Sequence, residues 1–220
     1  MQFSALILDM DGVLADTEPL HVNAWDLTLR GVQSEKTAHT PSPMALRAER
    51  ERMTGMSTPE IAAELVRVFS LAVTIEELLV KKRENFRAMV NVGLTPFPGL
   101  AEELARWRKS PLALATSSAR YEAILILDHL GFQNFFDPVI TCDDVQRAKP
   151  APDCYLLAAE RLGKRPEECV VIEDSANGIR AALDAGTQVL AVSPTAASGS
   201  IEGVHGVFQS TVEALRWLRS

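Results

Sequence analysis

Residues 5–12 read Ala-Leu-Ile-Leu-Asp-Met-Asp-Gly, and this stretch decides how the chain folds. Its four apolar residues predict a short strand that is buried on both faces. Two carboxylates and a glycine follow at once, so the strand ends at residues suited to binding a ligand. Two later apolar runs stop in the same way, at 112–115 before Thr116 and at 169–172 before Glu173.

Helical patterns separate these apolar runs along the chain. They cover residues 120–130, 153–163 and 177–185, and shorter apolar runs at 139–140 and 189–192 predict two further strands. Regular alternation of strands and helices predicts an α/β fold with a doubly wound parallel sheet, a Rossmann-like core.

A long insertion separates the first two predicted strands. The hundred or so residues between them far exceed the dozen or more that one crossover needs, and residues 18–90 consist almost wholly of helical patterns. Two prolines and a glycine within residues 95–99 preclude a continuous helix there. We therefore expect a core domain of residues 1–16 and 92–220, and an inserted all-helical cap domain of residues 17–91.

The composition is that of an ordinary globular protein. The 220 residues carry a formal charge of -7, and the 22 basic residues are scattered, which argues against nucleic acid as a partner. Three cysteines form no CxxC pair, which fits a reducing compartment. The chain begins without a cationic leader and has no apolar run of membrane-spanning length. We expect a cytoplasmic protein without a membrane partner, as a monomer or weak homo-oligomer.

The residues that follow the predicted strands carry the chemistry. In a parallel sheet the carboxyl ends of the strands meet at one crevice, where Asp9, Asp11, Thr116, Glu173 and Asp174 would converge. Carboxylates at such close quarters repel one another unless a cation neutralises them. A small set of hard oxygen ligands suits Mg²⁺, so the sequence predicts a magnesium site.

The Asp-Met-Asp-Gly sequence supplies two carboxylates with different tasks. Asp9 could attack the phosphorus of a bound phosphate and divide one difficult displacement into two easier ones. Asp11 could act as the general acid for the leaving oxygen and later as the base that activates water. Gly12 would let the chain turn sharply beside the phosphate.

Residues 9–16, Asp-Met-Asp-Gly-Val-Leu-Ala-Asp, resemble the first signature of the haloacid dehalogenase superfamily of phosphatases and phosphomutases. The resemblance covers residues 3 to about 194, with a cap between the first two motifs. The other signatures occur in the family's order: Thr116-Ser117-Ser118, Lys149-Pro150, and Glu173-Asp174-Ser175-Ala176-Asn177-Gly178.

This resemblance implies a phosphatase that forms an aspartyl-phosphate on Asp9, with Mg²⁺ as cofactor. It implies that the Thr116 hydroxyl and the Ser117 amide hold the phosphate, and that Lys149 neutralises charge on the transferred group. The ligands that it implies for Mg²⁺ are Asp9, the backbone carbonyl of Asp11, Asp174 and, either directly or behind another ligand, Glu173.

The start of the predicted cap resembles the sugar-phosphate branch of the family, which includes β-phosphoglucomutase. His21 and Trp25 lie four residues apart and share a helix face. In that branch such residues, and a cap lysine with which Lys82 aligns, face the substrate. The alternative interpretations are a half-buried histidine with a core tryptophan, and a solvated helix face for Lys82.

The cap loop around Gly55 departs from the mutase pattern. That pattern has a lysine just before the glycine and an arginine three residues after it, where this chain has Thr54 and Thr58. We therefore expect hydrolysis of a small phosphorylated metabolite, in particular a sugar phosphate. Arg50 or Arg52 could replace the missing cations, so a β-phosphoglucomutase-type mutase remains the alternative, and an inactive phosphate-binding member of the family ranks below it.

Overall fold

The computed structural model describes residues 3–36, 53, 56–193 and 202–220. Within these residues, six parallel strands form one sheet in the order β3-β2-β1-β4-β5-β6. The strands are β1 (Ala5–Leu8), β2 (Leu112–Ala115), β3 (Val139–Ile140), β4 (Cys169–Glu173), β5 (Gln188–Val192) and β6 (Gly206–Phe208). The predicted doubly wound α/β fold is confirmed, and β6 is a strand that the apolar pattern did not predict.

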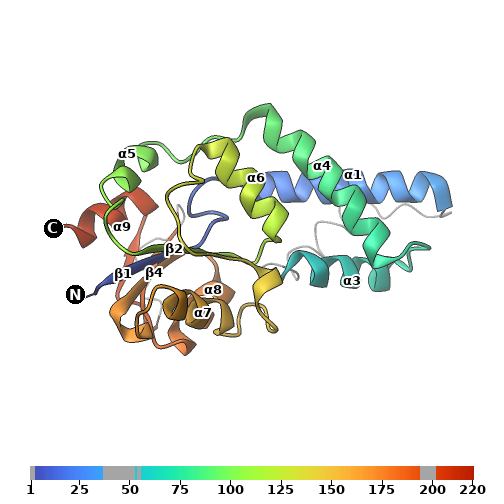
Figure 1. The fold of residues 1–220 in the computed structure, drawn as a ribbon. Coiled ribbons are helices and arrows are strands. Elements are labelled where there is room, and N and C mark those ends of the chain that lie inside the picture. Colours follow the sequence, from blue (N-terminus) through green and yellow to red (C-terminus); the bar gives the residue numbers. More distant parts are fainter. Residues whose placement is uncertain (1–2, 37–52, 54–55, 194–201) are drawn as a thin grey trace.

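Helices cover both faces of the sheet and extend beyond one end of it (Figure 1). The sheet carries α5 (Leu100–Ala105), α6 (Arg120–Leu130) and α9 (Thr211–Leu218) on one face, and α7 (Asp153–Arg161) and α8 (Ala176–Asp184) on the other. Short 3-10 turns occupy Cys142–Asp144 (η1) and Pro166–Glu168 (η2). The remaining helices are α1 (Glu18–Lys36), α3 (Thr58–Phe69) and α4 (Ile75–Gly93). None of the described helices is long and apolar enough to cross a bilayer.

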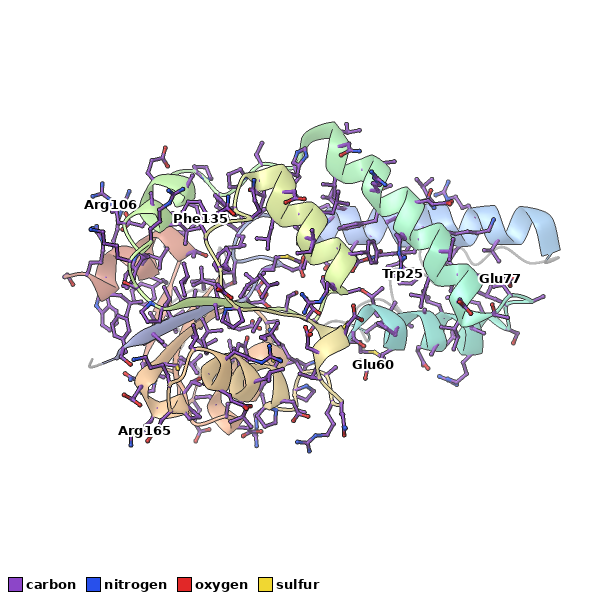
Figure 2. All side chains as sticks on the ribbon, in the orientation of Figure 1. Trp25, Glu60, Glu77, Arg106, Phe135 and Arg165 are labelled. Atoms are coloured by element: carbon purple, nitrogen blue, oxygen red, sulfur yellow. The ribbon has the colours of Figure 1, made fainter. Side chains whose placement is uncertain are left out.

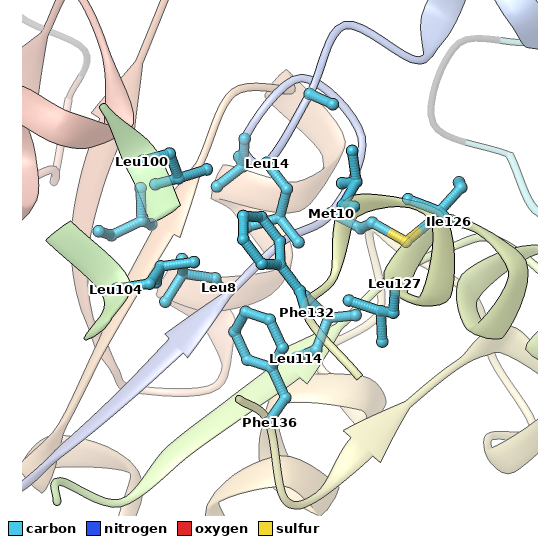
Figure 3. Close-up of a cluster of buried hydrophobic side chains, with 14 of the residues drawn as sticks. Leu8, Met10, Leu14, Leu100, Leu104, Leu114, Ile126, Leu127, Phe132 and Phe136 are labelled. Carbon is cyan, nitrogen blue, oxygen red and sulfur yellow. The ribbon is translucent and has the colours of Figure 1, made fainter. Parts of the chain in front are cut away.

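The strands are apolar throughout because each of their faces meets a separate hydrophobic cluster. In β1, Leu6 and Leu8 join a cluster with α5, α6 and α9, whereas Ala5 and Ile7 join a second cluster with α7 and α8. Successive side chains of a strand point to opposite faces, so a strand between two helical layers needs no polar residue. Figure 3 shows part of the first cluster, where Leu8 lies beside Leu104 and Leu114 lies beside Phe132.

The helices α1, α3 and α4 gather beyond the carboxyl ends of the strands (Figure 1). They share a third hydrophobic cluster, which includes Trp25, Leu29, Leu65 and Leu78. The later part of α4 instead contributes Phe86 to the cluster beside the sheet. The helical insertion thus occupies the place from which a cap could cover the strand ends. The exact domain boundaries stay a prediction.

Candidate active site

A cavity of about 490 Å³ lies where the carboxyl ends of the strands meet the cap helices. Eight of the predicted site residues line it: Asp9, Asp11, His21, Trp25, Ser117, Lys149, Glu173 and Asp174. Residues from the cap side complete the wall, among them Met53, Met56, Thr58 and Ile61. The sheet therefore brings together residues that are up to 165 positions apart (Asp174 minus Asp9) in the chain.

Lys149 lies at the floor of this cavity and uses all three of its ammonium hydrogens. Its Nζ donates to Asp9 Oδ1 at 2.7 Å, to Glu173 Oε1 at 2.8 Å and to the carbonyl oxygen of Ala115 at 3.1 Å. Burial by itself would lower the pKa of Lys149, but the charges of Asp9 and Glu173 raise that pKa well above its ordinary value. The lysine is therefore a fixed positive charge between two carboxylates.

The remaining carboxylates are too crowded for one lysine to neutralise. Oxygen atoms of Asp9, Glu173 and Asp174 all lie within 4.8 Å of one another. Burial, helped by the neighbouring acidic groups, raises the pKa of Asp9 well above its ordinary value, although Lys149 acts in the opposite direction. Desolvation by the pocket, with the charges of Glu173 and Asp11, raises the pKa of Asp174 to about 8. A divalent cation bound by hard oxygen ligands would relieve this repulsion, so the donor set fits Mg²⁺.

Both oxygens of Glu173 already have partners. Oε1 accepts hydrogen bonds from Lys149 and from the Tyr155 hydroxyl at 3.0 Å, and Oε2 accepts one from the Ser175 backbone N–H at 2.7 Å. Gly178 makes room for this carboxylate, since a Cβ atom there would lie 1.5 Å from Glu173 Oε1. The geometry fits Glu173 as the residue that holds Lys149 in place beside the carboxylate of Asp9.

Gly12 makes the second close approach in the site. Its φ of +74° lies in the left-handed region, and a Cβ atom at this position would come within 1.9 Å of Asp174 Oδ2. Only glycine adopts this turn without strain and leaves that space open. The loop after β1 can thus pass directly over the Asp174 carboxylate.

The Asp11 carboxylate accepts hydrogen bonds from four side chains. Thr17 Oγ1 and His21 Nε2 donate to its Oδ1, the latter at 3.2 Å. Thr116 Oγ1 and Ser118 Oγ donate to its Oδ2 at 3.2 and 2.9 Å. Burial would raise the pKa of Asp11, but the hydrogen bonds from His21 and from the hydroxyl groups hold that pKa well below its ordinary value. Asp11 is therefore ionised in this arrangement, and the Thr116 hydroxyl is directed at it.

Lys82 lies behind His21 and does not line the cavity. Its side chain is fully buried, so it does not lie on a solvated helix face. Its Nζ lies 3.1 Å from His21 Nδ1 and pairs with the carboxylate of Glu122 on α6. The His21 ring stacks on Phe86, with 4.5 Å between the ring centroids. Lys82 therefore contacts His21, and any effect that it has on a bound substrate would pass through His21.

Trp25 forms part of the cavity wall within the cap cluster. Only 3% of its surface is exposed, and Figure 2 shows it among the cap helices, away from the sheet. It thus combines the two interpretations of this position, a core tryptophan that also borders the cavity. The cap-loop residues Gly55, Thr54, Arg50 and Arg52 lie outside the described residues.

The sequence patterns missed several residues that build this site. Thr17 and Ser118 bind Asp11, and Tyr155 binds Glu173. Ser118 belongs to the Thr-Ser-Ser motif, which could have indicated it, whereas Tyr155 and Glu122 occur in ordinary helix patterns. Their contacts depend on how distant elements pack.

Comparison with known proteins settles the family. The family model described as haloacid dehalogenase-like hydrolase matches residues 3–186, which is most of the chain and includes all the motifs described above. The chain belongs to the haloacid dehalogenase-like hydrolases. The predicted resemblance is thus confirmed, and with it the predicted enzyme class, a phosphatase with a phosphomutase as the alternative.

Individual relatives span nearly the whole chain. Fructose-1-phosphate phosphatase YqaB of Escherichia coli is 34% identical over 87% of this chain and 97% of its own length. Beta-phosphoglucomutase of Bacillus subtilis is 28% identical over 83% of this chain and 80% of its own. The crystal structure of CbbY from Rhodobacter sphaeroides in complex with phosphate superposes with a TM-score of 0.82 at 27% identity, covering 96% of both chains.

Proposed function

We propose that this hydrolase is a magnesium-dependent phosphatase that acts on a small phosphorylated sugar or a similar metabolite through an aspartyl-phosphate on Asp9. The single observation that carries the proposal is the cluster of Asp9, Lys149 and Asp174 at the floor of a cavity. It combines a buried nucleophile, a fixed cation and a crowded set of oxygen ligands, which phosphoryl transfer requires.

The proposed metal ligands are Asp9, Asp174 and the backbone carbonyl of Asp11. Lys149 binds Oδ1 of Asp9, and no hydrogen bond of the described residues involves Oδ2. The saturated hydrogen bonding of Glu173 favours a supporting role for it. When bound, Mg²⁺ would supply Lewis-acid charge that reduces the repulsion between the negative phosphate and the Asp9 carboxylate.

In the first step, an Asp9 oxygen attacks phosphorus and the bond from phosphorus to the ester oxygen breaks. The leaving oxygen takes a proton from the Asp11 carboxyl group. Asp11 is ionised in the observed arrangement because His21, Thr17, Thr116 and Ser118 all donate to it. A bound phosphate would compete for the Thr116 and Ser118 hydroxyls, and the loss of these donors would raise the proton affinity of Asp11.

In the second step, water attacks the phosphorus of the aspartyl-phosphate while Asp11 accepts a proton from that water. The bond between phosphorus and Asp9 breaks, which restores the carboxylate and releases inorganic phosphate. The ionised Asp11 of the observed arrangement is the form that this step needs. Lys149, the Thr116 hydroxyl and the Ser117 backbone N–H are proposed to hold the transferred phosphoryl group in both steps.

The rest of the cavity favours a small, mainly uncharged substrate body. Its volume of about 490 Å³ suits a small metabolite. Trp25, Met56 and Ile61 supply apolar surface, and among the described lining residues Lys149 is the one lysine or arginine. The names of the relatives point to the same class, since fructose-1-phosphate phosphatase is among them.

A screen of phosphomonoesters tests this function. Purified protein with Mg²⁺ would be supplied with hexose, pentose and polyol phosphates, with nucleotides and phosphoamino acids for comparison, and released phosphate measured. We expect hydrolysis that depends on Mg²⁺, is fastest with sugar or polyol phosphates and disappears in the Asp9→Asn variant. Equal activity in that variant would refute the proposal.

The mutase is the second candidate, favoured by the relative named beta-phosphoglucomutase. A mutase must hold a bisphosphate while it turns round, and that requires cations on the cap side of the cavity. The described residues on that side include His21 and Thr58 but no lysine or arginine that lines the cavity. An assay with β-glucose 1-phosphate and a trace of the 1,6-bisphosphate separates the two. We expect free phosphate with little glucose 6-phosphate, whereas fast isomerisation without phosphate release would establish the mutase.

A further inference from the structure

Glu122 is a buried carboxylate at the junction between the sheet domain and the cap. It belongs to α6, which packs on the sheet, and its side chain has no exposed surface. One carboxylate oxygen, Oε1, binds the Lys82 ammonium of α4, and the other, Oε2, accepts a hydrogen bond from Thr58 Oγ1 of α3 at 2.9 Å. A single side chain of the core thus holds two cap helices.

The contacts continue from Lys82 to the proposed acid-base residue. Lys82 Nζ lies 3.1 Å from His21 Nδ1, and His21 Nε2 lies 3.2 Å from Asp11 Oδ1. An ammonium group has donors but no acceptor, so Nδ1 must be the acceptor in its contact with Lys82. His21 then carries its hydrogen on Nε2 and donates it to Asp11. The chain of contacts therefore fixes both the tautomer and the direction of the His21 ring.

The aromatic groups around Lys82 do not by themselves direct its ammonium group toward His21. Its Nζ lies over the rings of Phe86 and Trp25, 4.5 and 5.5 Å from their centroids, and its side chain has no exposed surface. Aromatic faces attract a cation but do not define its direction as a carboxylate does. Among the described contacts, the Glu122 carboxylate is the one charged partner that directs Lys82 toward His21.

We propose that Glu122 is a positioning residue for the reaction: it directs Lys82 onto His21 Nδ1, and so orients the His21 Nε2–H against Asp11 when the cap lies over the sheet. This inference rests on the proposed function of Asp11. It adds a core residue, distant from the substrate, that couples the position of the cap to the geometry of the acid-base group.

A double-mutant cycle on Glu122 and Lys82 tests the proposal. Glu122→Gln keeps the shape of the side chain but removes its charge, and Lys82→Met removes the ammonium and keeps an apolar stem. A misplaced reacting group costs on the order of 10²-fold, so we expect kcat of Glu122→Gln to fall by about that factor with little change in KM. Because Glu122 acts through Lys82, the double variant should be no slower than Lys82→Met alone.

The double variant also covers the case in which Glu122→Gln fails to fold. Removing one partner leaves a buried charge unpaired, whereas removing both does not. Losses that multiply in the double variant, or an unchanged kcat in Glu122→Gln, would overturn the proposal. Tyr121→Phe is the matched control, because it removes the 2.6 Å hydrogen bond from Tyr121 to Glu122 Oε1 and leaves the contacts to Lys82 and His21. Its kcat should stay close to that of the parent.

Nitrogen-15 NMR of the imidazole groups supplies a readout that does not depend on turnover. The chain has four histidines, and a His21→Gln variant assigns the signal of interest. The parent should show an unprotonated Nδ1 and a protonated Nε2 at His21, and Glu122→Gln should show averaged tautomers. An identical pair of signals in both proteins would overturn the proposal. If no phosphate ester were hydrolysed, the proposed function would fail while this signature still tested the role of Glu122.

Discussion

Replacing Gly178 with alanine should both destabilise and slow the enzyme, although alanine is normally the better helix residue. Gly178 is in the first turn of α8, and in an ordinary helix alanine is more favourable than glycine by about 0.5–1 kcal/mol. Here the added Cβ atom would lie 1.5 Å from Glu173 Oε1 and 2.0 Å from its carboxyl carbon. Both distances are far shorter than any non-bonded contact, so the carboxylate of Glu173 must move.

The cost of this movement follows from the bonds of Glu173 Oε1. That oxygen accepts hydrogen bonds from Lys149 and Tyr155 inside the protein. Hydrogen bonds to charged groups contribute about 1.5–3 kcal/mol each, so losing both would cost about 3–6 kcal/mol. After the gain in helix propensity, the free energy of unfolding should fall by about 2–5 kcal/mol. Lys149 would also lose Glu173 as a partner and keep only the carboxylate of Asp9. We therefore expect kcat to fall on the order of 10²-fold.

Urea unfolding and a phosphatase assay on the same preparation measure both effects. Gly31→Ala is the matched control, because Gly31 lies in α1 and a Cβ atom there would meet nothing within 4 Å. It should raise the free energy of unfolding by about 0.5–1 kcal/mol and leave kcat unchanged. A Gly178→Ala protein as stable and active as the parent would refute the account of how Glu173 is held.

Two further predictions concern the acid-base group and the metal. Asp11→Asn should slow hydrolysis of ordinary phosphate esters by roughly 10²–10⁴-fold. A substrate with a good leaving group should still phosphorylate Asp9 in this variant, so that aspartyl-phosphate accumulates. If the variant hydrolysed both kinds of ester at the rates of the parent, this role of Asp11 would be excluded. The pKa of Asp174 near 8 lies above its ordinary value of 3.8, so at pH 6 the metal-free protein holds a proton there that Mg²⁺ must displace. Magnesium affinity measured by calorimetry should therefore rise up to about pH 8, with proton release on binding that Asp174→Asn reduces but does not remove, because the pKa of Asp9 is raised as well. An affinity independent of pH would contradict the site.

Much of the fold could be predicted because burial on both faces leaves a simple mark on the sequence. The strand at Ala5–Leu8 has no polar residue, since helices cover both of its sides. Parallel strands bring their carboxyl ends to one edge, so Asp9 and Glu173 could be expected to meet. Both expectations follow from local patterns together with one general rule of topology.

The last strand, β6, could not be predicted in this way. Gly206–Phe208 is short, only half-buried and begins with a glycine, which strand patterns disfavour. It exists because its backbone pairs with Leu190, Ala191 and Val192 of β5 at the edge of the sheet. That pairing depends on the tertiary position of the segment.

The contacts of Lys82 and Glu122 were hidden for a similar reason. Glu122 lies at the third position of α6, where its carboxylate oxygen Oε2 also accepts the Ala119 N–H at 3.3 Å, so it looks like an ordinary helix-capping residue. Its ion pair with Lys82 joins residues 40 positions apart. Lysine in a run of charged residues favours a solvated helix face, whereas the packing of α4 against both α1 and α6 buries Lys82.

The central claim is that catalysis passes through a phosphoryl group bound covalently to Asp9. The direct measurement is rapid acid quenching of the parent protein during turnover of a labelled sugar phosphate with Mg²⁺, followed by peptide mapping. The account predicts an acid-stable, hydroxylamine-sensitive phosphoryl group on the peptide that contains Asp9, formed at least as fast as turnover and absent without Mg²⁺ or in Asp9→Asn. Turnover at full rate with no label on that peptide, or with inverted configuration at a chiral phosphorus, would contradict it.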